Sequence, residues 1–340
     1  PDVKGAIARA NRELAWPSRV TYARGDPPHP AHRRPSSRPE GMTLVERTAS
    51  GVDIAIQVTM LLDERQQRNA VYELNAWERA AGGDVASLFG SSIDGGLAIL
   101  VTEVSNRTLY DLWYSEDAAS KLRPELKLRM FVEILRGLSR LQSRGLVHRD
   151  VKPQNILVIG DPSSPEGCHA KIAELGLARP WNVLLGLRSD GWTTAGSPAY
   201  MAPEMWTGSG PRRKVDVWSA GILAYEMFIG GFPEQIVRHG DTQADSLESH
   251  PFMTRVPLGF DLSDDNRFRT FEAADHEMAA LIRRMLTTRV HRRPSIRRSL
   301  ARAKKIARSR GVIVPRQRRV KVSIEDLGLR GVEEARRVSP

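Results

Sequence analysis

The stretch LVHRDVKPQNILV, Leu146 to Val158, decides how the rest of this 340-residue sequence is interpreted. Its central octapeptide, HRDVKPQN, places a carboxylate, a cation and an amide within one short loop, at Asp150, Lys152 and Asn155. In-line phosphoryl transfer uses these chemical types, because a carboxylate orients the attacking hydroxyl, a cation lies near the phosphate and an amide oxygen binds metal. A chance match to the octapeptide alone has a prior below about one in ten. Three further motifs follow in order and lower it again: GSPAYMAPE (196–204), DVWSAG (216–221) and RRPS (292–295).

Apolar periodicity divides the chain into a strand-rich part and a helical part. Up to residue 106 we expect two helices, over 1–16 and 64–80, and four strands, over 19–24, 42–49, 52–58 and 96–104. Beyond it, the apolar spacing predicts helices over 125–145, 215–231 and 276–289, with Gly145 as a C-cap.

The predicted fold class is therefore α+β, with a small β-rich lobe followed by a larger helical lobe and a ligand cleft between them. The expected divisions are an N-terminal helical extension, the small lobe, the large lobe and a basic C-terminal extension, at 1–18, 19–105, 106–300 and 301–340.

Composition indicates a globular chain, with 41% hydrophobic and 27% charged residues. No apolar run reaches the roughly 18 residues of a membrane span. The single cysteine, Cys168, excludes an internal disulfide. The first residues, PDVKGAIARA, show no signal-peptide pattern, so the sequence gives no targeting address.

The net charge of +11 is concentrated near the C-terminus, because Arg289–Lys321 holds 14 Lys or Arg and no acid. Such a stripe attracts nucleic acid, anionic lipid or an acidic protein. We favour a solvated helix face instead, since no aromatic or fold signature of nucleic-acid binding accompanies the charge.

The four motifs resemble those of eukaryotic protein kinase domains, and the likeness covers about residues 19–300. The resemblance implies that Asp150 is the catalytic base, with Lys152 beside it, and that Asn155 is a metal ligand. It also implies that Glu204 and Arg293 form a buried ion pair and that Asp216 braces the catalytic loop. These last three residues would hold the larger lobe together whether or not the protein is active. GSPAYMAPE is similar to the Ser/Thr-directed form of its motif.

The nucleotide positions depart from this pattern. No G-x-G-x-x-G occurs, and a loop with five prolines, residues 25–41, takes its place; prolines remove N–H donors that would meet phosphate. In the family pattern, the third strand ends in a lysine. Here the corresponding residues read Ile-Ala-Ile-Gln and end at Gln57. A neutral amide can neither neutralise phosphates nor form an ion pair with the acid of the following helix, for which Glu73 is the candidate. No lysine occurs between Lys4 and Lys121, so a substitute cation from this lobe must be an arginine, and Arg47 is the candidate.

By the same resemblance, the rest of a nucleotide site would come from Ala55, Glu103, Ser105 and Leu157, with Ala55 and Leu157 holding adenine. In KIAELGLAR, Glu174 replaces the aspartate that binds metal with Asn155, and Leu175 replaces phenylalanine. The added methylene moves the carboxylate, and a displacement on the order of 1 Å can cost about a hundredfold in rate. We therefore expect no cofactor, or ATP and Mg²⁺ bound only weakly.

In lacking a glycine loop, the sequence resembles the secreted With-No-Gly-loop kinases of coccidian parasites. This likeness implies secretion into the parasitophorous vacuole or cyst compartment, with other secreted proteins as partners. The two basic segments, 25–41 and 297–321, are interpreted as unnecessary for the fold and complementary to an acidic partner.

We expect a pseudokinase that binds or scaffolds proteins with little or no phosphotransfer. The alternative is an atypical active Ser/Thr kinase, and binding to nucleic acid or a membrane surface is a third, minor hypothesis. Phosphorylation of Ser189, Thr193 or Thr194 stays open.

Overall fold

A computed structural model of the chain describes residues 41–47, 53–94, 96–105, 107–114, 122–161, 168–181, 196–206, 213–237, 260–317 and 320. Several sequence predictions lie outside these residues: the helix over 1–16, the strand over 19–24, the proline-rich loop up to residue 40, and the hydroxyl residues Ser189, Thr193 and Thr194.

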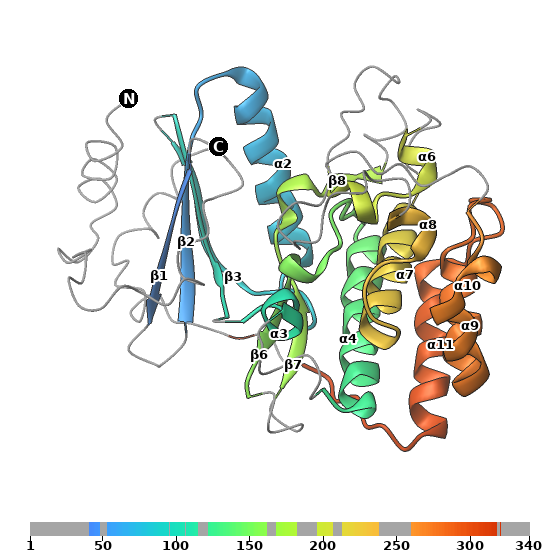
Figure 1. Ribbon diagram of the computed structural model, residues 1–340. Coiled ribbons are helices and arrows are strands. Elements are labelled where there is room, and N and C mark those ends of the chain that lie inside the picture. Colours follow the sequence, from blue (N-terminus) through green and yellow to red (C-terminus); the bar gives the residue numbers. More distant parts are fainter. Residues whose placement is uncertain are drawn as a thin grey trace. The chain divides into compact units, whose positions relative to one another are not determined.

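The chain divides into two compact units, and each is described by itself. The smaller unit comprises Pro1–Leu61, Ser87–Asn106 and Arg319–Pro340, and the larger comprises Leu62–Ala86 and Arg107–Arg318. The smaller unit carries the principal sheet and the larger is mainly helical (Figure 1). The predicted α+β class is confirmed.

The smaller unit is an antiparallel sheet with strand order β1-β2-β4-β3. Its strands are β1 (Gly41–Arg47), β2 (Asp53–Met60), β3 (Leu88–Asp94) and β4 (Leu97–Glu103). The predicted strands over 42–49, 52–58 and 96–104 correspond to β1, β2 and β4. Strand β3 was not predicted, because its sequence LFGSSID has few apolar residues and its register shifts between Leu88 and Gly90.

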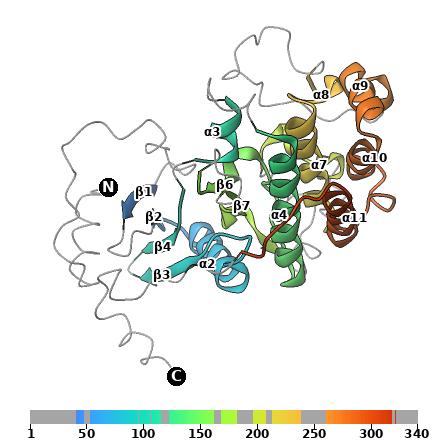
Figure 2. The same ribbon diagram turned by 90° about the horizontal axis from the view of Figure 1, so that it is seen from below.

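The larger unit is built around helices from distant parts of the sequence (Figures 1 and 2). Its helices are α2 (Glu64–Ala80), α3 (Leu109–Tyr114), α4 (Pro124–Ser143), α6 (Pro203–Trp206), α7 (Val215–Phe228), α8 (Glu234–Val237), α9 (Asn266–Ala274), α10 (His276–Met285) and α11 (Ile296–Ser309). Two small antiparallel ribbons pair β5 (Leu146–Val147) with β8 (Arg179–Pro180) and β6 (Ile156–Ile159) with β7 (His169–Ile172). No helix among the described residues is long and apolar enough to cross a bilayer.

The central helices form where the apolar pattern predicts them. In α7, every residue from Val215 to Met227 is buried, as expected for a helix that is apolar on nearly all sides. Helix α4 starts with Pro124 in its first turn, where the missing N–H costs no hydrogen bond. It ends before Gly145, whose φ of +77° is in the left-handed region that favours glycine after a helix.

The basic stripe proves to be part of the larger unit. Helix α11 packs against α4 and crosses the boundary expected at residue 300. Its buried residues share one face: Ile296, Ser299, Ala303, Ile306 and Ala307. Beyond the helix, Arg136 Nη2 of α4 donates a 2.7 Å hydrogen bond to the Pro315 carbonyl. The interpretation that segment 297–321 is unnecessary for the fold is therefore wrong, because one face of its helix completes the core.

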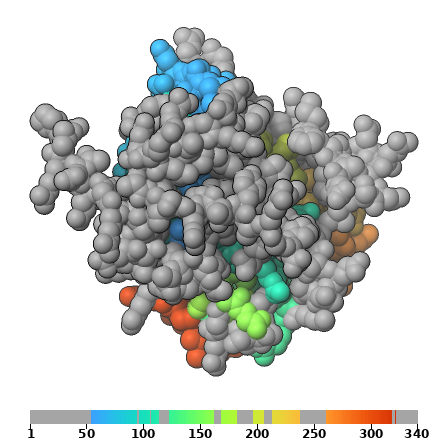
Figure 3. Space-filling view, turned by 90° about the vertical axis from the view of Figure 1, so that its left-hand side faces the viewer, coloured from blue at the N-terminus to red at the C-terminus, as the bar shows by residue number. Residues whose placement is uncertain are grey.

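Helix α2 belongs to the larger unit, although the sequence analysis assigned it to the small lobe. Its buried side packs on the 3-10 turn Leu175–Leu177 that follows Glu174. Arg179 reinforces this contact, because its Nη2 donates to Asn69 Oδ1 at 2.6 Å and its guanidinium lies 5.1 Å from the Tyr72 ring centroid. The N-terminal part of the helix reaches the surface, coloured blue at the top of Figure 3.

Candidate active site

The loop HRDVKPQN, residues 148–155 and called the HRD loop below, lies between β5 and β6 and is held by a buried carboxylate of α7. Asp216 accepts hydrogen bonds from the backbone N–H groups of His148 and Arg149, both at 2.9 Å. Burial raises the pKa of Asp216, and the two N–H donors act in the opposite direction. Arg149 has a φ of +73°, which non-glycine residues seldom adopt. Asp216 therefore stabilises a backbone turn that the sequence would not form unaided, which is the bracing expected of it.

His148 connects the same loop to the segment before Glu174. Its Nδ1 lies 3.2 Å from the Asp150 N–H, and its Nε2 lies 3.0 Å from the Ala173 carbonyl oxygen. Because the backbone N–H can only donate, Nδ1 accepts and Nε2 carries the proton that it donates to Ala173. The imidazole thus fixes the distance between the two segments.

The three predicted catalytic residues come together around one carboxylate. Asp150 Oδ2 accepts from Asn155 Nδ2 at 2.9 Å and lies 3.0 Å from Lys152 Nζ. Asp150 Oδ1 accepts from both the backbone N–H and the hydroxyl of Ser197, at 3.0 and 3.1 Å. Lys152 Nζ also donates to Ser197 Oγ at 2.8 Å. The carboxylate is consequently held in one orientation by donors from two separate segments.

Ser197, the second residue of GSPAYMAPE, is a site residue that was not predicted from the sequence. Its hydroxyl lies between the Asp150 carboxylate and the Lys152 ammonium group. A hydroxyl in this position shows that the two groups can act together on an alcohol, with Asp150 as acceptor and Lys152 as donor. The sequence signal was a hydroxyl residue at the start of the motif, but its partner lies 47 residues away.

Glu174 projects from a left-handed backbone position, with φ 57° and ψ 70°, and is exposed. The neighbouring Leu175 is fully buried, so the replacement of phenylalanine by leucine keeps an apolar anchor. The Ala173 N–H donates to the Asn155 carbonyl at 2.9 Å and connects the two predicted metal ligands through the backbone.

Asn155 and Glu174 are the side chains of this site that could hold a cation. Asn155 uses its Nδ2 for Asp150, which leaves the carboxamide oxygen as a ligand. Within the described ranges, no group of three or more His, Cys, Asp or Glu residues is arranged to hold a metal. Mg²⁺ requires six oxygens in near-octahedral geometry. Water and substrate phosphates commonly supply most of these oxygens, so two protein side chains can suffice, and the departure at this site is the longer side chain of Glu174.

The remaining nucleotide positions are divided between the two units. In the smaller unit, Ala55 is buried, Gln57 is half-buried opposite Thr43 and Leu100, and Ser105 follows β4. Glu103 is buried and accepts the Ser87 N–H at 2.9 Å. In the larger unit, Glu73 of α2 and Leu157 of β6 are both buried.

Arg47 does not lie beside Gln57. Strand register pairs Arg47 with Asp53, whereas Gln57 pairs with Thr43. The four-residue offset corresponds to about 13 Å along the strand. This register argues against Arg47 as the substitute cation.

The segment that carries Ser197 is anchored by a buried ion pair. Arg293 Nη1 and Nη2 donate to the two carboxylate oxygens of Glu204 at 2.7 and 2.9 Å. Tyr200 adds a hydrogen bond to Glu226 on α7 at 2.5 Å. In the HRD loop, Arg149 is buried near Arg179. Burial is the larger cause and repulsion by the Arg179 charge the smaller cause of a pKa of Arg149 lowered to about 10. The ion pair and the Tyr200 hydrogen bond hold the Ser197 segment to α7 and to the turn before α11.

A braced HRD loop, an aspartate oriented by lysine and asparagine, and a buried Glu–Arg anchor together define the architecture of a protein kinase. The chain belongs to the protein kinase domain family, whose model matches residues 45–303.

Curated relatives share this domain. Serine/threonine-protein kinase PkaB of Streptomyces coelicolor is 31% identical over 167 residues, 47% of this chain and 39% of that protein. Protein kinase 3 of Dictyostelium discoideum is 34% identical over 154 residues, 44% of this chain and 16% of the relative. A cAMP-dependent protein kinase, catalytic subunit-like, from Caenorhabditis briggsae is 37% identical over 134 residues, 38% and 30% of the two chains. Each alignment spans less than half of the relative.

Proposed function

We propose that this kinase-fold protein acts mainly by binding other proteins and transfers phosphate from ATP slowly or not at all. The observation that carries the proposal is Gln57, a neutral amide on β2 at the position that resembles the phosphate-binding lysine of the family. An amide supplies no charge to offset a triphosphate. Arg47 is displaced along the sheet and offers no evident substitute.

Two further departures act on the same ligand. Glu174 carries its carboxylate on a longer side chain than the family's aspartate, and the sequence has no glycine-rich loop. Groups that position one substrate act as a unit, so their losses do not simply add. This favours a module in which the kinase architecture serves binding.

The second candidate is an atypical active Ser/Thr kinase without a glycine loop. The complete Asp150–Lys152–Asn155 network favours it, as does the Ser197 hydroxyl between the first two side chains. In this function Asp150 would orient a substrate hydroxyl and receive its proton. The relatives named above carry the titles of protein kinases.

A finer placement among the With-No-Gly-loop kinases of coccidian parasites is also proposed, with the bradyzoite pseudokinase as one member that the chain resembles. It is supported by the absent glycine motif, the proline-rich loop and the altered residues Gln57 and Glu174. With it come a proposed vacuolar or cyst location and partners among secreted proteins.

Nucleotide binding tests the main proposal. ATP is titrated with and without Mg²⁺ while the melting temperature is followed, because ligand at about a hundred times its Kd adds about 2.7 kcal/mol of stability. We expect no Mg²⁺-dependent shift at micromolar ATP. A clear shift at that concentration, with transfer to a generic substrate that disappears in Asp150→Asn, would establish the active kinase instead.

Restoration variants sharpen the test. We expect neither Gln57→Lys nor Glu174→Asp alone to produce transfer, since each repairs one of three defects. Clear transfer by Glu174→Asp alone, absent when Asp150→Asn is added, would refute the proposed function.

We propose that the acidic partner contacts the exposed face of α11. Arg297, Lys305 and Arg308 are exposed on it, whereas Arg302 donates to Glu277 of α10 at 3.1 Å. Capture from secreted material should therefore compare wild type with the triple change of these three exposed residues to Glu, leaving Arg302 intact. Loss of acidic partners at low salt supports the face, and identical partners for both proteins would exclude it.

A further inference from the structure

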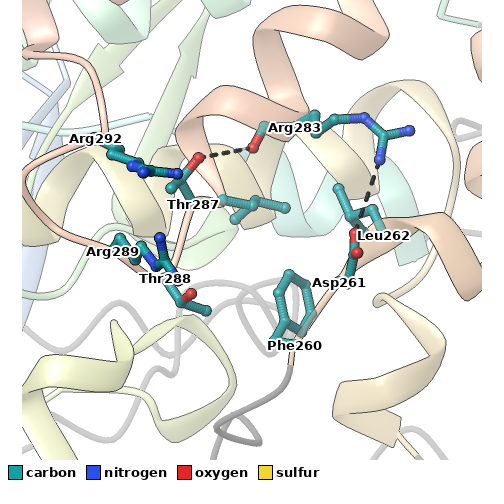
Figure 4. Close-up of a pocket in the computed structure, with 9 residues that line it drawn as sticks. Phe260, Asp261, Leu262, Arg283, Thr287, Thr288, Arg289 and Arg292 are labelled. Carbon is teal, nitrogen blue, oxygen red and sulfur yellow. Dashed lines mark hydrogen bonds and ion pairs between the residues drawn. The ribbon is translucent and has the colours of Figure 1, made fainter.

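A cavity of about 200 Å³ opens on the larger unit, away from the HRD loop. It lies between the C-terminal end of α10, the turn that follows it, and residues Phe260, Asp261 and Leu262 (Figure 4). Its lining has two chemical parts. Phe260, Leu262 and Leu286 supply apolar surface, and arginine and threonine side chains supply the polar part.

Arg289 and Arg292 give the cavity two uncompensated positive charges. Both are exposed, and neither guanidinium has a hydrogen bond or ion pair to the described part of the chain. A backbone hydrogen bond from Arg292 N–H to the Arg289 carbonyl, at 2.9 Å, closes the turn that carries both. Figure 4 shows the two side chains on the same side of the cavity. They can therefore approach one anion together.

The third lining arginine is already compensated. Arg283 Nη2 donates to Glu272 Oε2 at 2.6 Å, and Nη1 lies 3.8 Å from Asp261 Oδ1. Asp261 is thus held near Arg283 at the opposite side of the cavity from Arg289 and Arg292 (Figure 4).

The two threonines differ in the same way. Thr287 Oγ1 donates to the Arg283 carbonyl at 3.3 Å, so its proton is used. The Thr288 hydroxyl makes no such hydrogen bond to the described residues and can donate to a ligand. The unused donors of the cavity are therefore two guanidinium groups and one hydroxyl.

We infer that this cavity binds a phosphorylated serine or threonine of a partner protein. This inference rests on the proposed protein-binding function and specifies the kind of partner. A phosphate monoester carries nearly two negative charges and three acceptor oxygens, which match two guanidinium groups and a hydroxyl. A carboxylate would leave one arginine unmatched. Phe260 and Leu286 form the apolar wall of the cavity and are themselves largely buried, so they offer a small apolar contact to the residue next to the phosphoresidue. This wall favours a peptide over a free anion.

Calorimetry on the full chain, at constant ionic strength, tests the inference with three probes. One is a peptide with phosphoserine flanked by leucines, the second the same peptide with glycines in place of the leucines, and the third inorganic phosphate. The test variant is Arg289→Gln with Arg292→Gln. The matched control is Arg65→Gln with Arg284→Gln, two exposed arginines outside both the cavity and the proposed α11 face, whose loss gives the same change in net charge.

We expect the leucine-flanked phosphopeptide to bind most tightly, and the cavity variant to weaken it by at least about tenfold through loss of charged hydrogen bonds. The control should stay within about twofold, and both variants should melt like wild type. Equal weakening in the two variants would show nonspecific attraction and overturn the inference. Equal binding of the peptides and inorganic phosphate would exclude a peptide ligand. Neither result would alter the nucleotide-binding test of the proposed function.

Discussion

Replacement of Arg293 by methionine is the most direct test of how the Ser197 segment is anchored. The Arg293 side chain is fully buried and makes four hydrogen bonds, two to Glu204 and one each to the carbonyls of Thr287 and Lys214. Methionine fills much of the volume but leaves the Glu204 carboxylate buried without its cation. Breaking a buried pair in this way costs about 3–5 kcal/mol.

That cost predicts a large change in melting temperature. A domain of this size loses about 2–4 °C per kcal/mol, so Arg293→Met should melt about 6–20 °C below wild type. Urea unfolding can be followed by tryptophan fluorescence, because the Arg293 guanidinium lies 5.1 Å from the Trp218 ring centroid. Both measurements should give the same order of variants.

Glu204→Gln supplies the comparison. The amide keeps one acceptor for Arg293, and the arginine retains its two backbone carbonyls, so we expect roughly half the loss found for Arg293→Met. If Glu204→Gln destabilises as much as Arg293→Met, or if the latter costs less than about 1 kcal/mol, the reasoning from buried charge is refuted.

Three further predictions concern the larger unit. Burial acts to raise the pKa of Asp275, but hydrogen bonds from Arg310 and the Met278 N–H lower it overall. Asp275→Ala should therefore cost about 1 kcal/mol at pH 7, and the difference in urea unfolding should vanish as pH falls below the ordinary value of 3.8; an unchanged difference at pH 2.5 would contradict this. Burial raises the pKa of the Cys168 thiol to about 11, so iodoacetamide at pH 8 should label it slowly in the native protein and rapidly in urea, and equal rates would disprove its burial. Gly137→Ala should cost about 1–3 kcal/mol in unfolding free energy, because the new Cβ would lie 2.6 Å from the Asp84 carbonyl oxygen, and a neutral result would show that α4 can shift.

The sequence alone indicated most of the helical core. The apolar spacing of α4, α7 and α10 gave their positions within a few residues, since each helix must bury a continuous face. It missed β3, where polar residues and glycine obscure the alternation that marks a strand, and α3, which spans only six residues. These two elements are too weakly patterned to be recognised without their neighbours.

The charge count misdirected the interpretation of α11. Fourteen basic residues in 289–321 suggested a solvated extension, yet Ile296, Ala303 and Ile306 recur at helical spacing and pack on α4. Long basic side chains can border an apolar stripe without interrupting it. Net charge describes the exposed face of such a helix, and only packing shows the other face.

The chemistry of the candidate site was determined by the sequence, and its geometry by the tertiary structure. The spacing in the sequence places Asp150, Lys152 and Asn155 in one loop, and the departures Gln57 and Glu174 can be read from the sequence directly. The sequence separation is 47 residues between Ser197 and Asp150, 68 between His148 and Asp216, and 89 between Glu204 and Arg293. Local periodicity carries no information on such partners, because contacts at this separation exist only after the helices have packed and the loop entropy has been overcome.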